Sequence, residues 1–256
     1  MSHLHIPDGV LPLWLVALGW VVAAVYVGLA LIAVRKGERV QLVPRVGVVA
    51  ALVLAAMSTE IVPIAYHLNL TVLAGIILGP AAGVLAAFAV NLILALFGHG
   101  GVTVIGLNTV VIGTEVVAGF LLFRGFSRLV GDRPGLAAGL ATVLALALST
   151  TLMIGIVGLS RIAPTHARDL GSLDPKTLTL ANPFGHGLVA NRIVTPEQGA
   201  PAGDGGVSLT RFAIAVYALG AIGWAIEATL TGFIVSFVAR VRAELLRPGE
   251  SGVSWT

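Results

Sequence analysis

The sequence has no cysteine and little charge, and both absences narrow the class of protein. Because the chain has no thiol, cysteine thiolates cannot be metal ligands. The lack of cysteine is compatible with either a reducing or an oxidising compartment. Only 11% of the 256 residues are charged and 57% are hydrophobic, whereas an ordinary soluble domain carries roughly 25% charged residues. The mean hydropathy is +0.99. This composition excludes a soluble domain and indicates a protein of the lipid bilayer.

Three sequence patterns are also missing. No GxxxxGK[ST] motif occurs, since the lysines follow only Arg35 and Pro175, so any energy from ATP must come from a partner. No HExxH motif occurs, which argues against an intramembrane zinc protease. No Lys or Arg precedes Arg35, so the first apolar run does not resemble a cleaved signal peptide and the N-terminus is expected to be mature apart from Met1.

Long apolar runs carry most of the chain. Crossing about 30 Å of hydrocarbon takes ~20 helical residues, and no run shows the period-two alternation of a barrel strand. Two runs contain one carboxylate each, Glu115 and Glu227. The sequence therefore predicts an all-α integral membrane protein. Its apolar runs are Leu11–Val34, Val46–Met57 with its continuation towards Tyr66, Leu70–Phe97, Val102–Phe123, Leu136–Leu159 and Phe212–Ala239.

Basic residues predict the topology, because positive charge concentrates in cytoplasmic loops. They gather in three places: Arg35, Lys36, Arg39 and Arg45; Arg124, Arg128 and Arg133; and Arg240, Arg242 and Arg247. We expect the N-terminus outside, the C-terminus cytoplasmic, and two short bent helices in Leu70–Phe97, broken at Gly79-Pro80. That makes about seven transmembrane helices in a single domain, 1–243, with an N-terminal metal-capping segment, 1–10, an extracytoplasmic loop, 161–210, and a cytoplasmic tail, 244–256.

Histidines are the candidate metal ligands. In this topology His3, His5, His67 and His99 all lie near the outer face, and imidazole suits Ni, Co, Cu and Zn. An amino-terminal amine closely followed by His can chelate Ni(II) or Cu(II) with a planar set of nitrogens. His3 stands third, or second if Met1 is removed and Ser2 supplies the amine. The turn signal in Ile6-Pro7-Asp8-Gly9-Val10 can fold these histidines over the bundle. The alternatives are a disordered tail and, for His166 and His186, solvated loop histidines.

Several segments together resemble the CbiM/NikM family, the substrate-binding (S) components of energy-coupling-factor importers for cobalt and nickel. The likeness covers nearly the whole membrane portion. Its segments are His5-Ile6-Pro7-Asp8-Gly9, His67-Leu68, Leu73-Ala74-Gly75-Ile76-Ile77-Leu78-Gly79-Pro80, Phe97-Gly98-His99-Gly100-Gly101, Gly106-Leu107-Asn108 and Trp224-Ala225-Ile226-Glu227-Ala228-Thr229-Leu230-Thr231.

The resemblance implies a seven-helix bundle in a prokaryotic cell membrane whose N-terminal loop plugs a metal site. It implies that the chain is not an enzyme, holds no cofactor, and captures Ni(2+) or Co(2+) outside as the transported ligand, the cobalt supplying cobalamin biosynthesis. The implied partners are a transmembrane coupling (T) subunit, ATPase subunits and, in some systems, a small accessory membrane subunit, with lipid around the bundle and no nucleic acid.

The N-terminus of this chain departs from the pattern of metal ligands that the family resemblance implies. In the family the terminal amine, the backbone nitrogen and ring of the motif histidine, and a second histidine at the position of His67 hold the metal. Because Met1-Ser2-His3-Leu4 precedes His5, His5 cannot form that fused chelate with the amine. Either Ser2 and His3 form the chelate after removal of Met1, with His5 as an additional or replacement ligand, or His5 and His67 bind and the extension contributes only through His3. His5 and His67 rank first as ligands and His3 next. The Gly-Gly usual after the second histidine is replaced by Leu70-Thr71.

For several other polar and small residues, the sequence allows more than one role. His99 is expected to orient a ligand, or else to be a turn histidine held by backbone carbonyls. Glu115 and Glu227 are expected to hydrogen-bond structurally to Asn91, Asn108 or nearby Thr. Gly47, Ala51 and Ala55 form a small-residue ridge for the coupling subunit or for packing within the bundle. Other function classes are a stand-alone secondary divalent-metal permease, in which the two glutamates couple ion flow, and a metal sensor or scaffold.

Overall fold

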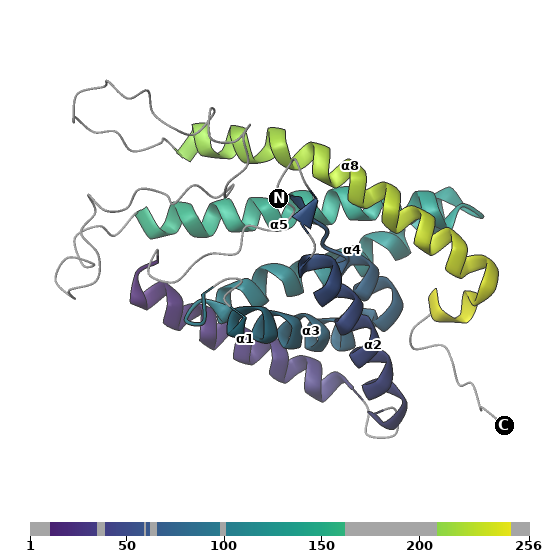
Figure 1. Cartoon of the computed structure of the whole chain (residues 1–256), viewed down its shortest axis with the longest axis horizontal. Helices are drawn as coiled ribbons and strands as arrows, with labels where there is room; N and C mark the ends of the chain where they lie inside the picture. Colours follow the sequence, from purple (N-terminus) through teal and green to yellow (C-terminus); the bar gives the residue numbers. More distant parts are fainter. Residues whose placement is uncertain are drawn as a thin grey trace.

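The computed structural model describes residues 11–34, 39–58, 60–61, 66–97, 101–161 and 209–246, and these residues are almost entirely helical. Figure 1 shows α5 and α8 running side by side, with α1 on the opposite side of the bundle and α3 and α4 between them. The elements are α1 (Leu13–Ala33), α2 (Arg39–Ser58), β1 (Glu60–Ile61), β2 (Tyr66–His67), α3 (Thr71–Leu96), α4 (Ile105–Val130), α5 (Pro134–Arg161), α8 (Leu209–Val241) and the short 3-10 helix η1 (Ala243–Leu246).

Five of the described helices, α1, α3, α4, α5 and α8, are long and apolar enough to cross a bilayer. The apolar part of α2, Leu42–Ser58, is shorter. These lengths and compositions confirm the expected all-α, multi-pass membrane protein. The count of seven crossings and the orientation of the termini stay predictions.

The helix α3 consists of two helices, as the sequence predicts. Gly79 has φ 78° and ψ 173°, a backbone conformation that only glycine adopts without strain. A Cβ added to Gly83 would lie 3.4 Å from the Cα of Gly75, although eight residues of a straight helix would separate the two by about 12 Å. The chain therefore folds back at Gly79-Pro80 and brings the two halves of α3, 71–78 and 80–96, into contact.

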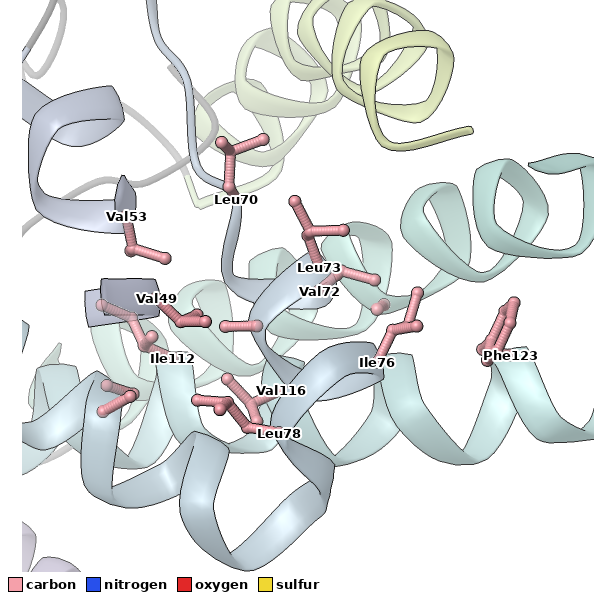
Figure 2. Close-up of a cluster of buried hydrophobic side chains, with 14 of the residues drawn as sticks. Val49, Val53, Leu70, Val72, Leu73, Ile76, Leu78, Ile112, Val116 and Phe123 are labelled. Atoms are coloured by element: carbon pink, nitrogen blue, oxygen red, sulfur yellow. The ribbon is translucent and has the colours of Figure 1, made fainter. Parts of the chain in front are cut away.

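The first half of α3 packs against α4 through glycine. A Cβ at Gly75 would lie 2.4 Å from the carbonyl oxygen of Val116, so only glycine allows the two backbones to come this close. Figure 2 shows the apolar side chains around this contact, with Val49 and Val53 reaching it from α2 and Ile76 and Leu78 from α3. This cluster fixes both halves of α3 inside the bundle.

The helix α1 packs against the first turns of α4. A Cβ at Gly106 would lie 2.7 Å from the backbone nitrogen of Trp20, and one at Gly19 would lie 2.3 Å from the Cγ of Leu107. Next to this crossing, the indole Nε1 of Trp20 donates to the carbonyl oxygen of Thr103 at 2.7 Å. Small residues thus bring α1 onto the start of α4.

Several basic residues that were expected in cytoplasmic loops lie on helices. Arg39 and Arg45 belong to α2, and Arg124 and Arg128 to the last turns of α4. Hydropathy marks where an apolar run ends, but the α4 helix continues past that point into its polar turns. Gly135 at the start of α5 lies against Gly232 near the end of α8. Since α4 ends just before α5, the arginines that end α4 and α8 lie at one end of the bundle.

The chain after α2 corrects a further expectation. The apolar run was expected to continue as helix towards Tyr66, but β1 and β2 form an antiparallel pair in which Glu60 faces His67 and Ile61 faces Tyr66. Pro63 in the sequence disfavours a continuous helix here. The expected loop, 161–210, and tail, 244–256, lie mostly outside the described residues, although Arg161 ends α5 and Leu209 begins α8.

Candidate metal centre

His67, the predicted imidazole ligand, is the last residue of β2 and is partly exposed. Its backbone is held on one side by the pairing with Glu60. On the other side the chain passes through Leu68 to Asn69, which is 1% exposed. His67 is therefore placed where a short hairpin enters the interior of the bundle.

Two buried carboxylates meet Asn69 from different helices. Its backbone N–H donates to Glu227 Oε1 at 2.9 Å, and its side-chain Nδ2 donates to Glu115 Oε1 at 2.5 Å. The side-chain Oδ1 of Asn69 accepts the backbone N–H of Thr71 at 3.3 Å. One asparagine thus ties together α3, α4 and α8.

Glu115 is fully buried and accepts further hydrogen bonds. The hydroxyl of Thr71 donates to its Oε1, and Ser149 Oγ on α5 donates to its Oε2 at 2.8 Å. Burying a carboxylate is tolerable only when hydrogen bonds replace its hydration, and these donors do so. We call this network the carboxylate clamp; its members are Asn69, Thr71, Glu115, Ser149 and Glu227.

The clamp lies deep in the bundle. Glu115 stands about 15 Å along α4 from Ile105, at 1.5 Å of rise per residue, and Ser149 and Glu227 lie near the middles of α5 and α8. The first half of α3, 71–78, spans only about 12 Å and starts at this depth. A short half-helix that begins inside the bundle places the positive end of its dipole there, where carboxylates stabilise it.

Glu115 and Glu227 form buried hydrogen bonds, as expected, but some of the expected hydrogen-bond partners are wrong. A Thr takes part, namely Thr71. Asn91, which was offered as a partner, instead donates through its Nδ2 to Thr109 Oγ1 at 3.5 Å. Sequence reasoning missed Asn69 and Ser149. The available signal was their polarity within otherwise apolar stretches, at Leu68-Asn69-Leu70 and before Thr150.

Most of the predicted ligands lie outside the described residues: Ser2, His3, His5 and His99, as do His166 and His186. Among the residues that the structure describes, no three His, Asp or Glu side chains group as metal ligands. His67 is the predicted ligand whose place is described. The complete ligand set stays a prediction.

The small-residue ridge on α2 faces away from the bundle. Gly47, Ala51 and Ala55 are all exposed, and a Cβ at Gly47 would meet no atom within 4 Å. Packing within this bundle, one of the two alternatives for the ridge, is therefore wrong for the described helices. The ridge is a smooth surface along which another transmembrane helix can approach closely.

Comparison with known proteins gives one family and several relatives. The family model described as "Cobalt uptake substrate-specific transmembrane region" matches residues 5–245. The chain is 34% identical over 191 residues to the cobalt transport protein CbiM of Geobacter sulfurreducens, which covers 69% of this chain and 55% of that protein. It is 32% identical over 158 residues to an Archaeoglobus fulgidus protein named, provisionally, as a fused nickel transport protein NikMN, covering 60% and 52%.

The fold is also similar to a solved structure. The crystal structure of a truncated transition metal transporter matches with a TM-score of 0.66 and 19% identity, covering 93% of this chain and 99% of that chain. At this identity the likeness concerns the fold. The chain spans about half the length of the two relatives named above.

Proposed function

We propose that this chain, which belongs to the CbiM family, is the substrate-capture (S) component of an ATP-driven importer for nickel or cobalt. The relatives named above are transport proteins for these metals. The observation that supports the proposal is the position of His67, whose imidazole is of a metal-ligating type and which lies two residues along the chain from Asn69 of the buried carboxylate clamp. The chain makes and breaks no covalent bonds in this role.

The proposed ligands are His67 and nitrogens of the N-terminal segment. His5 and His3 contribute imidazoles, and Ser2 contributes the terminal amine if Met1 is removed, while His99 orients a ligand. An imidazole and amine set prefers Ni(II) and Co(II) to Mg(II) or Ca(II), which seek oxygen. The mass of the mature N-terminus, together with the metal affinities of His3→Ala and His5→Ala, tests which histidine completes the chelate.

Transport requires partners in this proposal. The metal is chelated from outside, the N-terminal segment closes over it, and ATPase subunits acting through a transmembrane coupling subunit drive its release inside. The exposed ridge of Gly47, Ala51 and Ala55 supports a contact with such a subunit, because small residues let helices pack closely in lipid. A small accessory membrane subunit is a further proposed partner.

A second candidate is a stand-alone secondary permease, which the two buried carboxylates favour, because buried acidic residues often couple ion flow. Uptake of radiolabelled nickel and cobalt into proteoliposomes separates the two. The S-component proposal expects uptake only with coupling and ATPase subunits and ATP. Equal uptake by the chain alone, driven by an ion gradient, would establish the permease instead.

A further inference from the structure

We propose that Glu115 and Glu227 are positioning residues for the metal ligand His67. Through Asn69, the two carboxylates set the depth and direction of the chain that carries the imidazole. The proposal rests on the metal-capture function proposed above and adds to it a role for the carboxylate clamp. Neither glutamate touches the metal in this account.

Asn69 is held through three separate groups. Its N–H bonds to Glu227 at 2.9 Å and its Nδ2 to Glu115 at 2.5 Å, while the N–H of Thr71 lies 2.6 Å from its carbonyl oxygen and 3.3 Å from its Oδ1. Bonds from a backbone atom and from both side-chain atoms fix the position of the residue and its rotation. Few residues in a connecting segment are restrained in this way, because such segments usually lie at the surface.

The carboxylates are themselves anchored to separate helices. Glu115 lies on α4 and takes a hydrogen bond from Ser149 on α5, while Glu227 lies on α8. Both side chains are at most 2% exposed. Hydrogen bonds to a charged acceptor are shorter and stronger than those between neutral groups. The clamp therefore holds Asn69 in a fixed position relative to three helices of the bundle, α4, α5 and α8.

The restraint extends to His67 because the connection is short. Two residues of extended chain span at most about 7 Å, and Leu68 is the single residue between His67 and Asn69. On its other side His67 is paired with Glu60 in the hairpin. A metal chelate requires its ligands within about 0.5 Å of the productive geometry, so a segment restrained at both ends is suited to present one.

A purely structural role of the clamp makes a different prediction. In that case its loss lowers the stability of the fold as much as the loss of any buried polar contact, and metal affinity follows stability. Positioning predicts instead that affinity and the geometry of the bound metal change while the bundle stays folded. Outer partners of metal ligands commonly change affinity by about 10–100-fold when removed.

The test uses the purified full chain in detergent. Calorimetry gives the affinity for Ni(II) and Co(II), the absorption spectrum of bound Co(II) reports ligand geometry, and thermal unfolding without metal reports the fold. The informative variants are Glu227→Met, which removes the acceptor of Asn69, and Glu227→Gln, whose amide oxygen can still accept. Thr142→Val is the control for burial, because Thr142 is 1% exposed and its hydroxyl bonds within α5 to Ala138.

We expect Glu227→Met to weaken metal binding about tenfold or more and to shift the Co(II) spectrum. Glu227→Gln should restore affinity to within about threefold of the wild type, since the hydrogen bond survives. Thr142→Val should leave affinity and spectrum unchanged. Wild-type affinity and spectrum in a folded Glu227→Met would overturn the positioning role, and so would an equal loss in Thr142→Val.

A second variant decides the matter if Glu227→Met does not fold. Ser149→Ala removes one donor to Glu115 and leaves the carboxylate in place, so it should weaken binding several-fold with an intact bundle. An unchanged affinity and spectrum in Ser149→Ala would then overturn the proposal. Failure of the wild type itself to bind nickel or cobalt would instead overturn the proposed function, and the positioning role with it.

Discussion

Gly83 lies against Gly75 across the break in α3, with 3.4 Å between the position of a Cβ on Gly83 and the Cα of Gly75. The two halves of α3 thus pack as a hairpin inside the bundle. This arrangement lets the first half begin at the depth of the carboxylate clamp. The position of His67 depends on it, because the chain reaches that depth directly after His67.

Gly75→Ala should destabilise the bundle. The new Cβ would lie 2.4 Å from the backbone carbonyl of Val116, and overpacking of this kind costs about 1–3 kcal/mol. Thermal unfolding in detergent measures the change. Gly28→Ala on α1 is the matched control, since its Cβ would meet nothing within 4 Å. Equal stability of the two variants would contradict the close packing of α3 on α4.

Gly79→Ala should also lower stability, for a different reason. The backbone of Gly79, at φ 78° and ψ 173°, is strained for any residue with a Cβ, at a cost of about 1–3 kcal/mol. The same unfolding assay applies, with Gly155→Ala on α5 as the control because it has open space. A variant as stable as the control would mean that α3 does not turn back at this residue.

Ala51→Leu should weaken assembly with a coupling subunit. Leucine replaces a small side chain in the middle of the ridge on α2, which prevents close helix packing. Co-purification of the chain with its coupling subunit measures assembly, while nickel binding by the isolated chain should stay unchanged. Gly28→Leu introduces the same side chain on α1 and should assemble normally. Normal assembly of Ala51→Leu would exclude the ridge as the contact.

The N-terminal chelate leads to a separate prediction. His5→Ala should remove most of the metal affinity, whereas His3→Ala should weaken binding less, if His5 and His67 are the principal ligands. The reverse order would indicate that Ser2 and His3 form the chelate after removal of Met1. Mass spectrometry of the mature chain gives the N-terminal residue needed to interpret either result.

The sequence predicts the helical class and the break in α3 because both follow from local chemistry. Long apolar runs must form helices in lipid, and Gly79-Pro80 interrupts one of them. The start of α2 and the end of α4 were predicted less accurately, because Arg39 and Arg128 are compatible with either a helix or a loop. Hydropathy alone does not distinguish these cases.

The clamp could not be predicted because it joins residues far apart in the chain. Glu115 stood out as a carboxylate in an apolar run, but Asn69 and Ser149 are 46 and 34 residues away from it. Which of several buried polar residues meets Glu115 depends on how α3, α4 and α5 pack. The hairpin of β1 and β2 was missed because strands of two residues leave no periodic pattern.

Metal binding by His67→Ala decides whether His67 is a metal ligand. Calorimetric titration of the purified chain with Ni(II) and Co(II) should show binding by the wild type and by His166→Ala, and none by His67→Ala, with all three folded by thermal unfolding. Wild-type affinity in folded His67→Ala would contradict the assignment of His67 as the metal ligand.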